Sequence, residues 1–241
     1  MMLLLDIGNS RIKWALVQDG RQVNVGAFEN SASVSLQQEF AALTVPSRVL
    51  VSNVAGEDAA KRVRELCTAW GRPVDFVSAK TEQCGVRNGY AQPQRLGSDR
   101  WAALIAAWHE VRGACLVVTC GTATTVDVLS AQGEFLGGLI LPGVDMMQRS
   151  LATGTAQLTT TEGSLRDFPL DTADAIYSGV IRATLGAIES QYALLKNTGA
   201  SVRCVLSGGA AVRVSPHLSI PFDHVDNLVL RGLQIIGEGA A

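Results

Sequence analysis

The sequence predicts an α/β protein of two similar lobes, residues 1–113 and 114–241, with a ligand-binding cleft between them. Three observations predict this fold class. Runs of apolar, β-branched residues alternate with helical patterns along the chain. The first apolar run ends in DIGNS and leads through a glycine turn into a second run. The stretch ACLVVTCGTATTVDVL repeats that order, so each lobe is expected to open with a hairpin.

In the first lobe, we expect strands at 2–7, 11–18, 23–28, 48–53 and 74–78. Helical patterns occupy 33–43 and 57–70, between the last three strands. A third helix is expected to begin near Ser98, a candidate N-cap, and to end at Gly113. The glycine-rich segment 79–97 before it is predicted to be a long loop.

In the second lobe, residues 114–143 predict strand, glycine turn, strand, turn and strand. A helix is expected at 144–152, a threonine-rich loop at 153–164 and a long helix at 172–195. The last part repeats strand and helix, first at 201–212 and then in NLVLRGLQIIG.

Composition limits the classes of function. With 47% hydrophobic and 17% charged residues, the chain is expected to be compact and globular. A net charge of -2 gives no basic field that would attract nucleic acid. The densest basic cluster, Lys61, Arg62 and Arg64, stands beside Glu57 and Glu65 and predicts a solvated helix face.

The N-terminal apolar run predicts the cellular location, and the number and spacing of the cysteines predict their redox state. The apolar run Met1–Leu5 is too short for a signal peptide, and no stretch reaches membrane-spanning length. We therefore expect a cytoplasmic protein that binds neither membrane nor nucleic acid. Five cysteines with no CxxC pair predict neither a disulfide framework nor a zinc site, and most are expected to be buried.

The two glycine turns, GNS and GTATT, carry the chemistry. Loops rich in Gly, Ser and Thr can hold an anion such as phosphate between them. A simpler interpretation is a hairpin connection, in which Gly and Asn tolerate positive φ and Asp caps its own turn. Neither GxxxxGK[ST] nor GxGxxG occurs, which disfavours a P-loop or dinucleotide site.

Asp6 sharpens the phosphate hypothesis. A buried carboxylate costs several kcal/mol unless a cation meets it, and Mg²⁺ carried by a nucleotide would do so. Lys13 either returns toward the turn as a counter-charge or points outward from an edge strand. A third glycine signal, LSGG at 206–209, ends a strand, and a purine lying against Gly208 and Gly209 would explain it.

Five motifs, in order over nearly the whole chain, resemble type III pantothenate kinase. They are DxGNSxxK at Asp6–Lys13, NGY…P..LGxDR at Asn88–Arg100, GTATTxD at Gly121–Asp127, GGxIxPG at Gly137–Gly143, and LSGG at 206–209. The resemblance implies two ribonuclease H-like lobes, as in the actin, hexokinase and sugar-kinase superfamily. It also implies ATP-dependent phosphorylation of pantothenate to 4′-phosphopantothenate, the first step of coenzyme A synthesis, by a homodimer.

The resemblance also implies site residues. ATP and its phosphates would be held by Asp6, Ile7, Gly8, Asn9, Ser10, Arg11, Ile12, Lys13 and Thr122. Asp6 would hold Mg²⁺, directly or through water. Asp127 would orient the second turn or a water on its metal, or would only cap that turn.

Pantothenate would be bound by the loop before the third helix. Asp99 matches the family's proton acceptor, and Arg100 suits the substrate carboxylate because its planar fork binds it bidentately. The remaining substrate contacts implied by the resemblance are Tyr90, Gly97, Ser98 and Thr172. The residues alone allow simpler interpretations: Asp99 favours a helix N-terminus, Arg100 forms a surface salt bridge, and Thr172 is an N-cap.

One position departs from the family pattern. Many members carry Asp two residues before the second glycine turn, where it binds a monovalent cation such as K⁺ or NH₄⁺, but this chain has Thr119. A hydroxyl binds such an ion more weakly, so we expect K⁺ activation to be weak, absent or met by other ligands. The apolar residues of the long helix are expected to form core or a dimer interface: Ile176, Val180, Ile181, Leu185 and Ile188.

Two rival functions stay open on the sequence. The first is another kinase or phosphatase of the same superfamily, acting on a sugar, acetate or polyphosphate. The second is a nucleotide-binding regulator without catalysis. Retention of Asp6, Lys13, Asp99 and Arg100 together argues against a regulator, and the LGSDR loop argues against a sugar substrate.

Overall fold

The computed structural model describes residues 1–31, 35–154 and 162–239. The chain forms two compact units, one of residues 1–110 with the C-terminal segment from Asn227, the other of residues 111–226. The sequence-based division grouped that last segment with the second half. It joins the first unit because its helix α7 (Leu228–Glu238) packs against β1 (Met2–Ile7), and Gly232 lies against the backbone of Ala102.

The first unit contains a five-stranded sheet in the order β3-β2-β1-β4-β5. Its other strands are β2 (Arg11–Gln18), β3 (Arg21–Glu29), β4 (Arg48–Asn53) and β5 (Val74–Phe76). The first three strands form an antiparallel meander, and β4 and β5 add in parallel on the β1 side. The predicted bounds of β1, β2 and β4 are confirmed, whereas β3 begins two residues earlier than expected.

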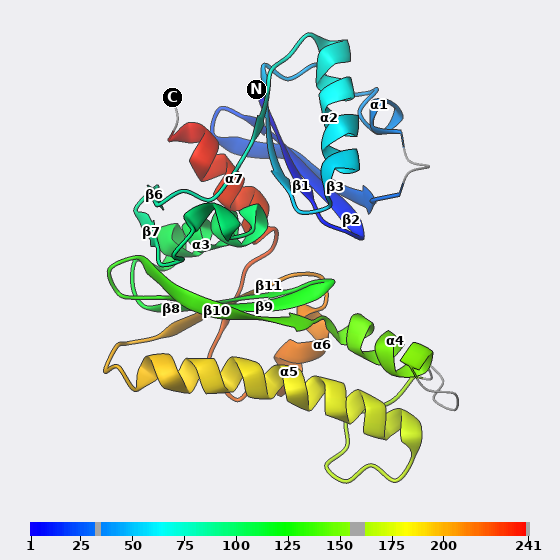
Figure 1. Cartoon of the computed structure of the whole chain (residues 1–241), viewed down its shortest axis with the longest axis vertical. Helices are drawn as coiled ribbons and strands as arrows, with labels where there is room; N and C mark the ends of the chain where they lie inside the picture. The colour runs from blue at the N-terminus through cyan, green and yellow to red at the C-terminus, as the bar shows by residue number, and fades with distance from the viewer. Residues whose placement is uncertain (32–34, 155–161, 240–241) are drawn as a thin grey trace. The chain divides into compact units, whose positions relative to one another are not determined.

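Helices lie on both faces of this sheet: α2 (Glu57–Trp70) packs on β4 and β5, and α7 packs on β1, β2 and β4 (Figure 1). The unit also contains α1 (Leu36–Glu39), which packs on α2, and α3 (Ser98–Val111). Because strand side chains alternate, Leu3, Leu5 and Ile7 share one face, where they pack with α2. Met2 shares the opposite face with Asp6 and lies against Gly237 of α7. Asp6 is therefore on the face that α2 does not cover.

Two predicted elements of this unit differ from the structure. The helix expected at 33–43 is a four-residue turn, and part of its expected start lies outside the described residues. Its apolar tail is not helical because Phe40 turns into the core, where it is 1% exposed. The loop expected at 79–97 contains short elements: β6 (Glu82–Gln83), β7 (Val86–Asn88) and the 3₁₀ turn η1 (Pro93–Arg95).

The second unit repeats the sheet of the first. Its strands are β8 (Cys115–Cys120), β9 (Ala123–Leu129), β10 (Glu134–Pro142), β11 (Arg203–Ser207) and β12 (Asp223–His224). Within this unit they run in the order β12-β11-β8-β9-β10, which is the order of the first unit with β8–β12 in place of β1–β5. The strand directions match as well, so the predicted repeat is confirmed.

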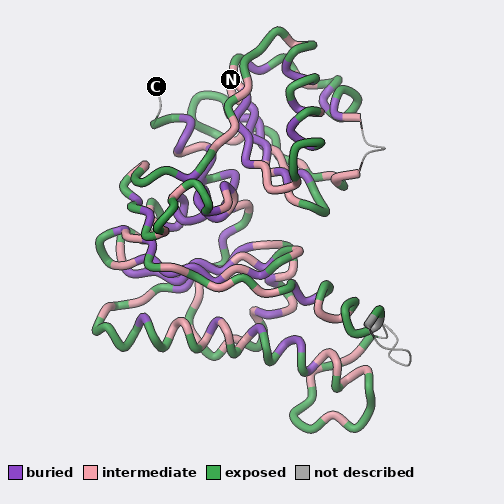
Figure 2. The backbone as a smooth tube through the Cα atoms, viewed as in Figure 1, coloured by how far each residue is buried: buried purple, intermediate pink, exposed green. Residues whose placement is uncertain are grey.

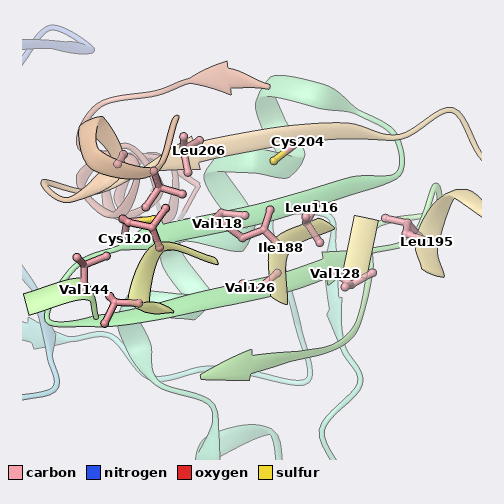
Figure 3. Packing of buried hydrophobic residues seen from close by; sticks show 14 of the residues in the cluster. Leu116, Val118, Cys120, Val126, Val128, Val144, Ile188, Leu195, Cys204 and Leu206 are labelled. Carbon is pink, nitrogen blue, oxygen red and sulfur yellow. The ribbon is translucent and has the colours of Figure 1, made fainter. Parts of the chain in front are cut away.

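Helices of the second unit are α4 (Val144–Gly154), α5 (Thr172–Lys196), α6 (Ala211–Val214) and the 3₁₀ turn η2 (Ser215–His217). The long helix α5 packs Val180, Ile181 and Ile188 into the core beside β8 and β9. Figure 3 shows Ile188 beside Val118 and Val126. These three α5 side chains are therefore core, whereas Ile176 and Leu185 are only partly buried. The predicted threonine-rich loop at 153–164 lies largely outside the described residues.

The strands in the middle of each sheet, such as β4 and β8, are buried along most of their length, whereas β3 and β10 are largely exposed or partly buried (Figure 2). All five cysteines are free thiols, and four of them are buried, as expected of small apolar side chains. In the described part of the chain, no helix has both the length and the apolar character needed to cross a bilayer.

Candidate active site

The first glycine turn closes the hairpin between β1 and β2. The Gly8 amide donates to the Arg11 carbonyl at 3.0 Å, and Asn9 and Ser10 are exposed at the tip. Neither Gly8 nor Asn9 has positive φ, so the expectation that the turn needs them for left-handed backbone is wrong. Gly8 serves close packing instead, since a Cβ would lie 3.3 Å from the Arg11 carbonyl oxygen.

Asp6 lies two residues before this turn, between Lys13 on β2 and Ser52 on β4 in the sheet register. Cross-strand partners share a face, so all three side chains project from the same side of the sheet. Burial and the carboxylate of Asp99 raise the pKa of Asp6 to about 7, and Lys13 partly opposes that rise. Lys13 therefore does not fully offset the burial of the Asp6 carboxylate and its repulsion from Asp99.

The start of α3 is joined to this face by a buried hydrogen bond. The hydroxyls of Ser52 and Ser98 lie 3.0 Å apart, and both side chains are buried. Ser98 is the first helical residue, and its hydroxyl pairs with Ser52. This bond holds the N-terminus of α3 beside the strand that carries Asp6.

Asp99 follows directly and stays partly exposed. Its Oδ1 accepts a hydrogen bond of 2.7 Å from the backbone amide of Arg100. A Cβ on Gly97 would lie only 2.7 Å from the same oxygen, so the glycine leaves room for the carboxylate. Since Asp99 raises the pKa of Asp6, the two carboxylates are close enough to interact.

Arg100 is buried, at 6% exposed, and its guanidinium faces the loop before α3. Nη1 donates to the Tyr90 hydroxyl at 3.0 Å, and the guanidinium lies 5.8 Å from the centre of the Tyr90 ring. Asn88 shapes that loop, because its side chain accepts from the Tyr90 amide and donates to the Pro93 carbonyl. The interpretation of Arg100 as a surface salt bridge is wrong.

In the second unit, the glycine turn after β8 is enclosed by two further glycines. The Gly121 amide donates to the Ala123 carbonyl at 3.0 Å, as Gly8 does in its own turn. Gly143 donates to the Thr122 carbonyl, and a Cβ on Gly143 would collide with the carbonyls of this turn. A Cβ on Gly208 would collide with the backbone of Cys120, so close chain packing explains this glycine without a purine.

Two further candidates lie in the strands of this sheet. Asp127 is inside β9, opposite Val117 and Gly138, and is 1% exposed. It is part of the ladder and does not lie in the turn itself. Thr119 stands in register with Thr125 and Ser207, so three hydroxyl-bearing residues share one row of the sheet where a carboxylate was expected in relatives.

Thr172 is exposed at the start of α5. The N-cap is Asp171, whose side chain accepts from the Asp174 amide at 2.9 Å, so the interpretation of Thr172 as the cap is wrong. Thr172 instead lines a largely apolar cavity of about 910 Å³ between α4 and α5, together with Met147 and Ile176.

A resident metal would need ligands. Within residues 1–31, 35–154 and 162–239, no group of three or more His, Cys, Asp or Glu side chains is arranged to hold one. A metal carried by a nucleotide needs fewer protein ligands, because phosphate and water supply the others. Asp6 fits such a metal, since a divalent cation would offset its burial and the charge of Asp99.

The first unit thus brings together Asp6, Lys13, Ser98 and Asp99, while Thr122, Asp127 and Thr172 belong to the second unit. The sequence analysis missed the residues that support this cluster: Ser52, Asn88, Asn30 and Arg62. Asn88 stood in a recognised motif. Ser52 could have been found from its place in the strand aligned with β1, since a serine there interrupts an apolar run.

Solved structures define the fold class. A Baf family protein from Campylobacter jejuni aligns with a TM-score of 0.63 at 24% identity, over 99% of this chain and 98% of that one. A candidate 2-dehydro-3-deoxygalactonokinase from Sinorhizobium meliloti gives 0.59 at 14% identity, over 97% of each chain. A candidate N-acetylmannosamine kinase from Listeria monocytogenes gives 0.55 at 15%, over 100% and 99%. The chain has the α/β fold of actin, hexokinase and the sugar kinases, built from two ribonuclease H-like units.

Sequence comparison identifies the family. The sequence model of type III pantothenate kinase matches residues 2–194. The type III pantothenate kinase of Nitrosospira multiformis is 48% identical over 240 residues, covering 99% of this chain and 91% of that protein. The one from Aromatoleum aromaticum is 47% identical over 238 residues, covering 99% and 98%. The chain belongs to the type III pantothenate kinase family.

Proposed function

We propose that this protein uses ATP to phosphorylate pantothenate, giving 4′-phosphopantothenate, the first step of coenzyme A synthesis. One observation carries the proposal beyond family membership. Asp6, Lys13 and Asp99 gather on one side of the first unit, beside a buried arginine on the same helix as Asp99. Phosphoryl transfer needs this combination of charge for phosphates and a carboxylate for the attacking alcohol.

In this proposal the first turn binds the polyphosphate. Residues 6–13 hold the ATP phosphates, with Lys13 as counter-charge, and Thr122 of the second unit adds a contact. Asp6 would hold Mg²⁺, directly or through water, and the ion would supply positive charge to the phosphate oxygens. No such role is proposed for Asp127, which lies within the β9 ladder and away from its turn.

Asp99 acts on the acceptor. The 4′-hydroxyl oxygen of pantothenate attacks the γ-phosphorus and forms the new O–P bond. The bond from that phosphorus to the bridging oxygen breaks, and ADP leaves with the electron pair. Asp99 accepts the hydroxyl proton, and orientation matters more than basicity because the transition state is loose.

The buried Arg100 binds the substrate carboxylate. A guanidinium held against the Tyr90 ring is preorganised, so little side-chain entropy is lost when it forms a bidentate pair. Tyr90, Gly97 and Ser98 complete the loop around pantothenate.

An ADP-release assay with several acceptors tests this function. The protein should turn over pantothenate but not mevalonate, glucose or acetate. Turnover of glucose without pantothenate would replace the proposal with a sugar kinase. Nucleotide binding without any turnover would make the protein a regulator.

We also propose that the protein is a cytoplasmic homodimer that pairs through the cavity between α4 and α5. Leu170, which lines this cavity, is 98% exposed, and Phe168, two residues before it in the sequence, is 90% exposed, which is costly for apolar side chains in a monomer. Thr172 would then serve the partner's pantothenate site. Light scattering should show that Leu170→Asp yields monomers while Leu194→Asp, on the exposed far end of α5, stays dimeric. A monomeric wild type would remove this part of the proposal.

A further inference from the structure

The first glycine turn is tied to a residue that follows β3. The side-chain Nδ2 of Asn30 donates to the Gly8 carbonyl at 2.7 Å, and its backbone amide donates to the Ser10 carbonyl at 3.0 Å. Asn30 is partly buried and lies 22 residues from Gly8 in the sequence. One residue therefore binds two carbonyls of a three-residue turn.

The hydrogen bond from Asn30 Nδ2 to the Gly8 carbonyl sets the orientation of the Gly8–Asn9 peptide group. The Gly8–Asn9 peptide is trans, so its N–H points opposite to its C=O. Because Asn30 draws the Gly8 carbonyl toward itself, the Asn9 N–H faces the other way. Turned around, the same peptide would present a carbonyl oxygen, which repels phosphate, where it now presents a donor.

Arg62 on α2 fixes the orientation of the Asn30 amide. Its Nη2 donates to Asn30 Oδ1, and its Nη1 donates to the Ser31 carbonyl at 2.8 Å. Since the amide oxygen is occupied by Arg62, the amide nitrogen must face Gly8. The interpretation of Arg62 as part of a solvated helix face is therefore wrong, although Lys61 and Arg64 are exposed as expected.

Close packing does not explain why the Asn30 and Arg62 side chains hold these positions. Asn30 and Arg62 both line a polar cavity of about 510 Å³, together with Asn9 and Asp58. A side chain beside such a cavity has room to rotate, so its hydrogen bonds must hold it in place. The network Gly8–Asn30–Arg62 supplies these bonds.

We infer that Asn30 and Arg62 are positioning residues that hold the Gly8–Asn9 peptide ready for a nucleotide phosphate. The inference rests on the proposed function for the identity of the ligand. Neither residue needs to touch ATP. Their effect should appear in nucleotide affinity and not in pantothenate affinity, because the network acts on the turn alone.

The test compares Asn30→Ala, Asn30→Asp and Arg62→Met with wild type. Arg64→Met is the matched control, since Arg64 lies two residues further along the same helix, where it pairs with Glu57 and lies over the Phe76 ring. Loss of one hydrogen bond predicts a rise of about 3- to 10-fold in KM for ATP and in Kd for the analogue AMPPNP. KM for pantothenate should stay within about twofold, and Arg64→Met should match wild type throughout.

Asn30→Asp separates positioning from general stability. The carboxylate can still accept from Arg62 but cannot donate to the Gly8 carbonyl, so this variant should bind AMPPNP no better than Asn30→Ala. Unchanged nucleotide affinity in folded Asn30→Ala, or equal changes in both KM values, would overturn the inference. If Asn30→Ala does not fold, Arg62→Met decides by the same criterion.

The outcomes also distinguish this inference from the proposed function. A wild type that binds AMPPNP without phosphorylating pantothenate would contradict the proposed function. The AMPPNP affinities of the variants would still test whether Asn30 positions the turn. A wild type that phosphorylates pantothenate, with unchanged AMPPNP affinity in the variants, would end this inference alone.

Discussion

The hydroxyls of Ser52 and Ser98 form a buried hydrogen bond of 3.0 Å that joins the end of β4 to the first turn of α3. Ser52 is also the register partner of Asp6 on β1. The bond therefore links the strand beside Asp6 to the helix that carries Asp99.

Ser52→Ala should weaken both the fold and the reaction. A buried hydroxyl left without its partner costs about 1–3 kcal/mol, and the start of α3 would lose a tie to the sheet. Urea unfolding measures the first effect and kcat the second. Ser190→Ala, which removes an exposed hydroxyl on α5, is the control. A Ser52→Ala protein as stable as this control would show that the bond contributes nothing.

Asp6 should make the ligand-free protein less stable as pH rises. Its folded pKa of about 7 lies above the ordinary 3.8, so the folded state holds the proton more tightly. The stabilising contribution is complete below about pH 4 and is lost as pH rises toward and through 7.

Asp6→Asn removes this titration. The full linkage value for a rise from 3.8 to about 7 is about 4 kcal/mol, and contact with solvent reduces it to on the order of 1–3 kcal/mol. Unfolding free energies of wild type and variant should therefore converge at low pH, apart from a constant offset, and diverge in favour of the variant between pH 4 and 7. Parallel curves would contradict the raised pKa.

Much of the fold could be predicted because it depends on local pattern. Strands β1, β2 and β4 and helices α2 and α5 follow from apolar periodicity, and the repeated glycine turns predicted the repeated sheet. The unit to which α7 belongs could not be predicted. A periodic apolar face requires a packing partner but does not specify which one.

The candidate site likewise contains residues that the sequence could identify and residues that it could not. Asp6 and Lys13 were found because charged residues beside apolar runs are conspicuous, whereas Asp99 was found through the resemblance of its motif to the family. Ser52 and Asn30 are ordinary strand-end residues until the register and the long-range hydrogen bonds are known. The sequence also favoured a solvated Arg62, since nothing local shows that its guanidinium reaches across to the end of β3.

Arg100→Lys should impair pantothenate binding selectively. An ammonium cannot form the bidentate pair, and hydrogen bonds to charged groups contribute about 1.5–3 kcal/mol, so KM for pantothenate should rise about 10- to 100-fold. KM for ATP should change little. The alcohol analogue of pantothenate, which lacks the carboxylate, should be used equally well by both proteins. An equal loss on that analogue would show that Arg100 does not bind the carboxylate.

Potassium should activate the enzyme weakly or not at all. The row Ser207, Thr119 and Thr125 offers hydroxyls where the family resemblance implies a carboxylate, and hydroxyls bind a monovalent cation less strongly. Initial rates titrated with KCl at constant ionic strength give the answer. Thr119→Asp should introduce K⁺ dependence, whereas strong saturable activation of the wild type would contradict this prediction.

Asp99→Asn tests most directly whether the cluster on the first unit performs phosphoryl transfer. The amide keeps the shape of the side chain and can still accept from the Arg100 amide, but it cannot take the proton of the attacking hydroxyl. We predict that AMPPNP binding stays near wild type while kcat for pantothenate falls by about 10²-fold or more. An Asp99→Asn enzyme that forms 4′-phosphopantothenate at the wild-type rate would contradict the account.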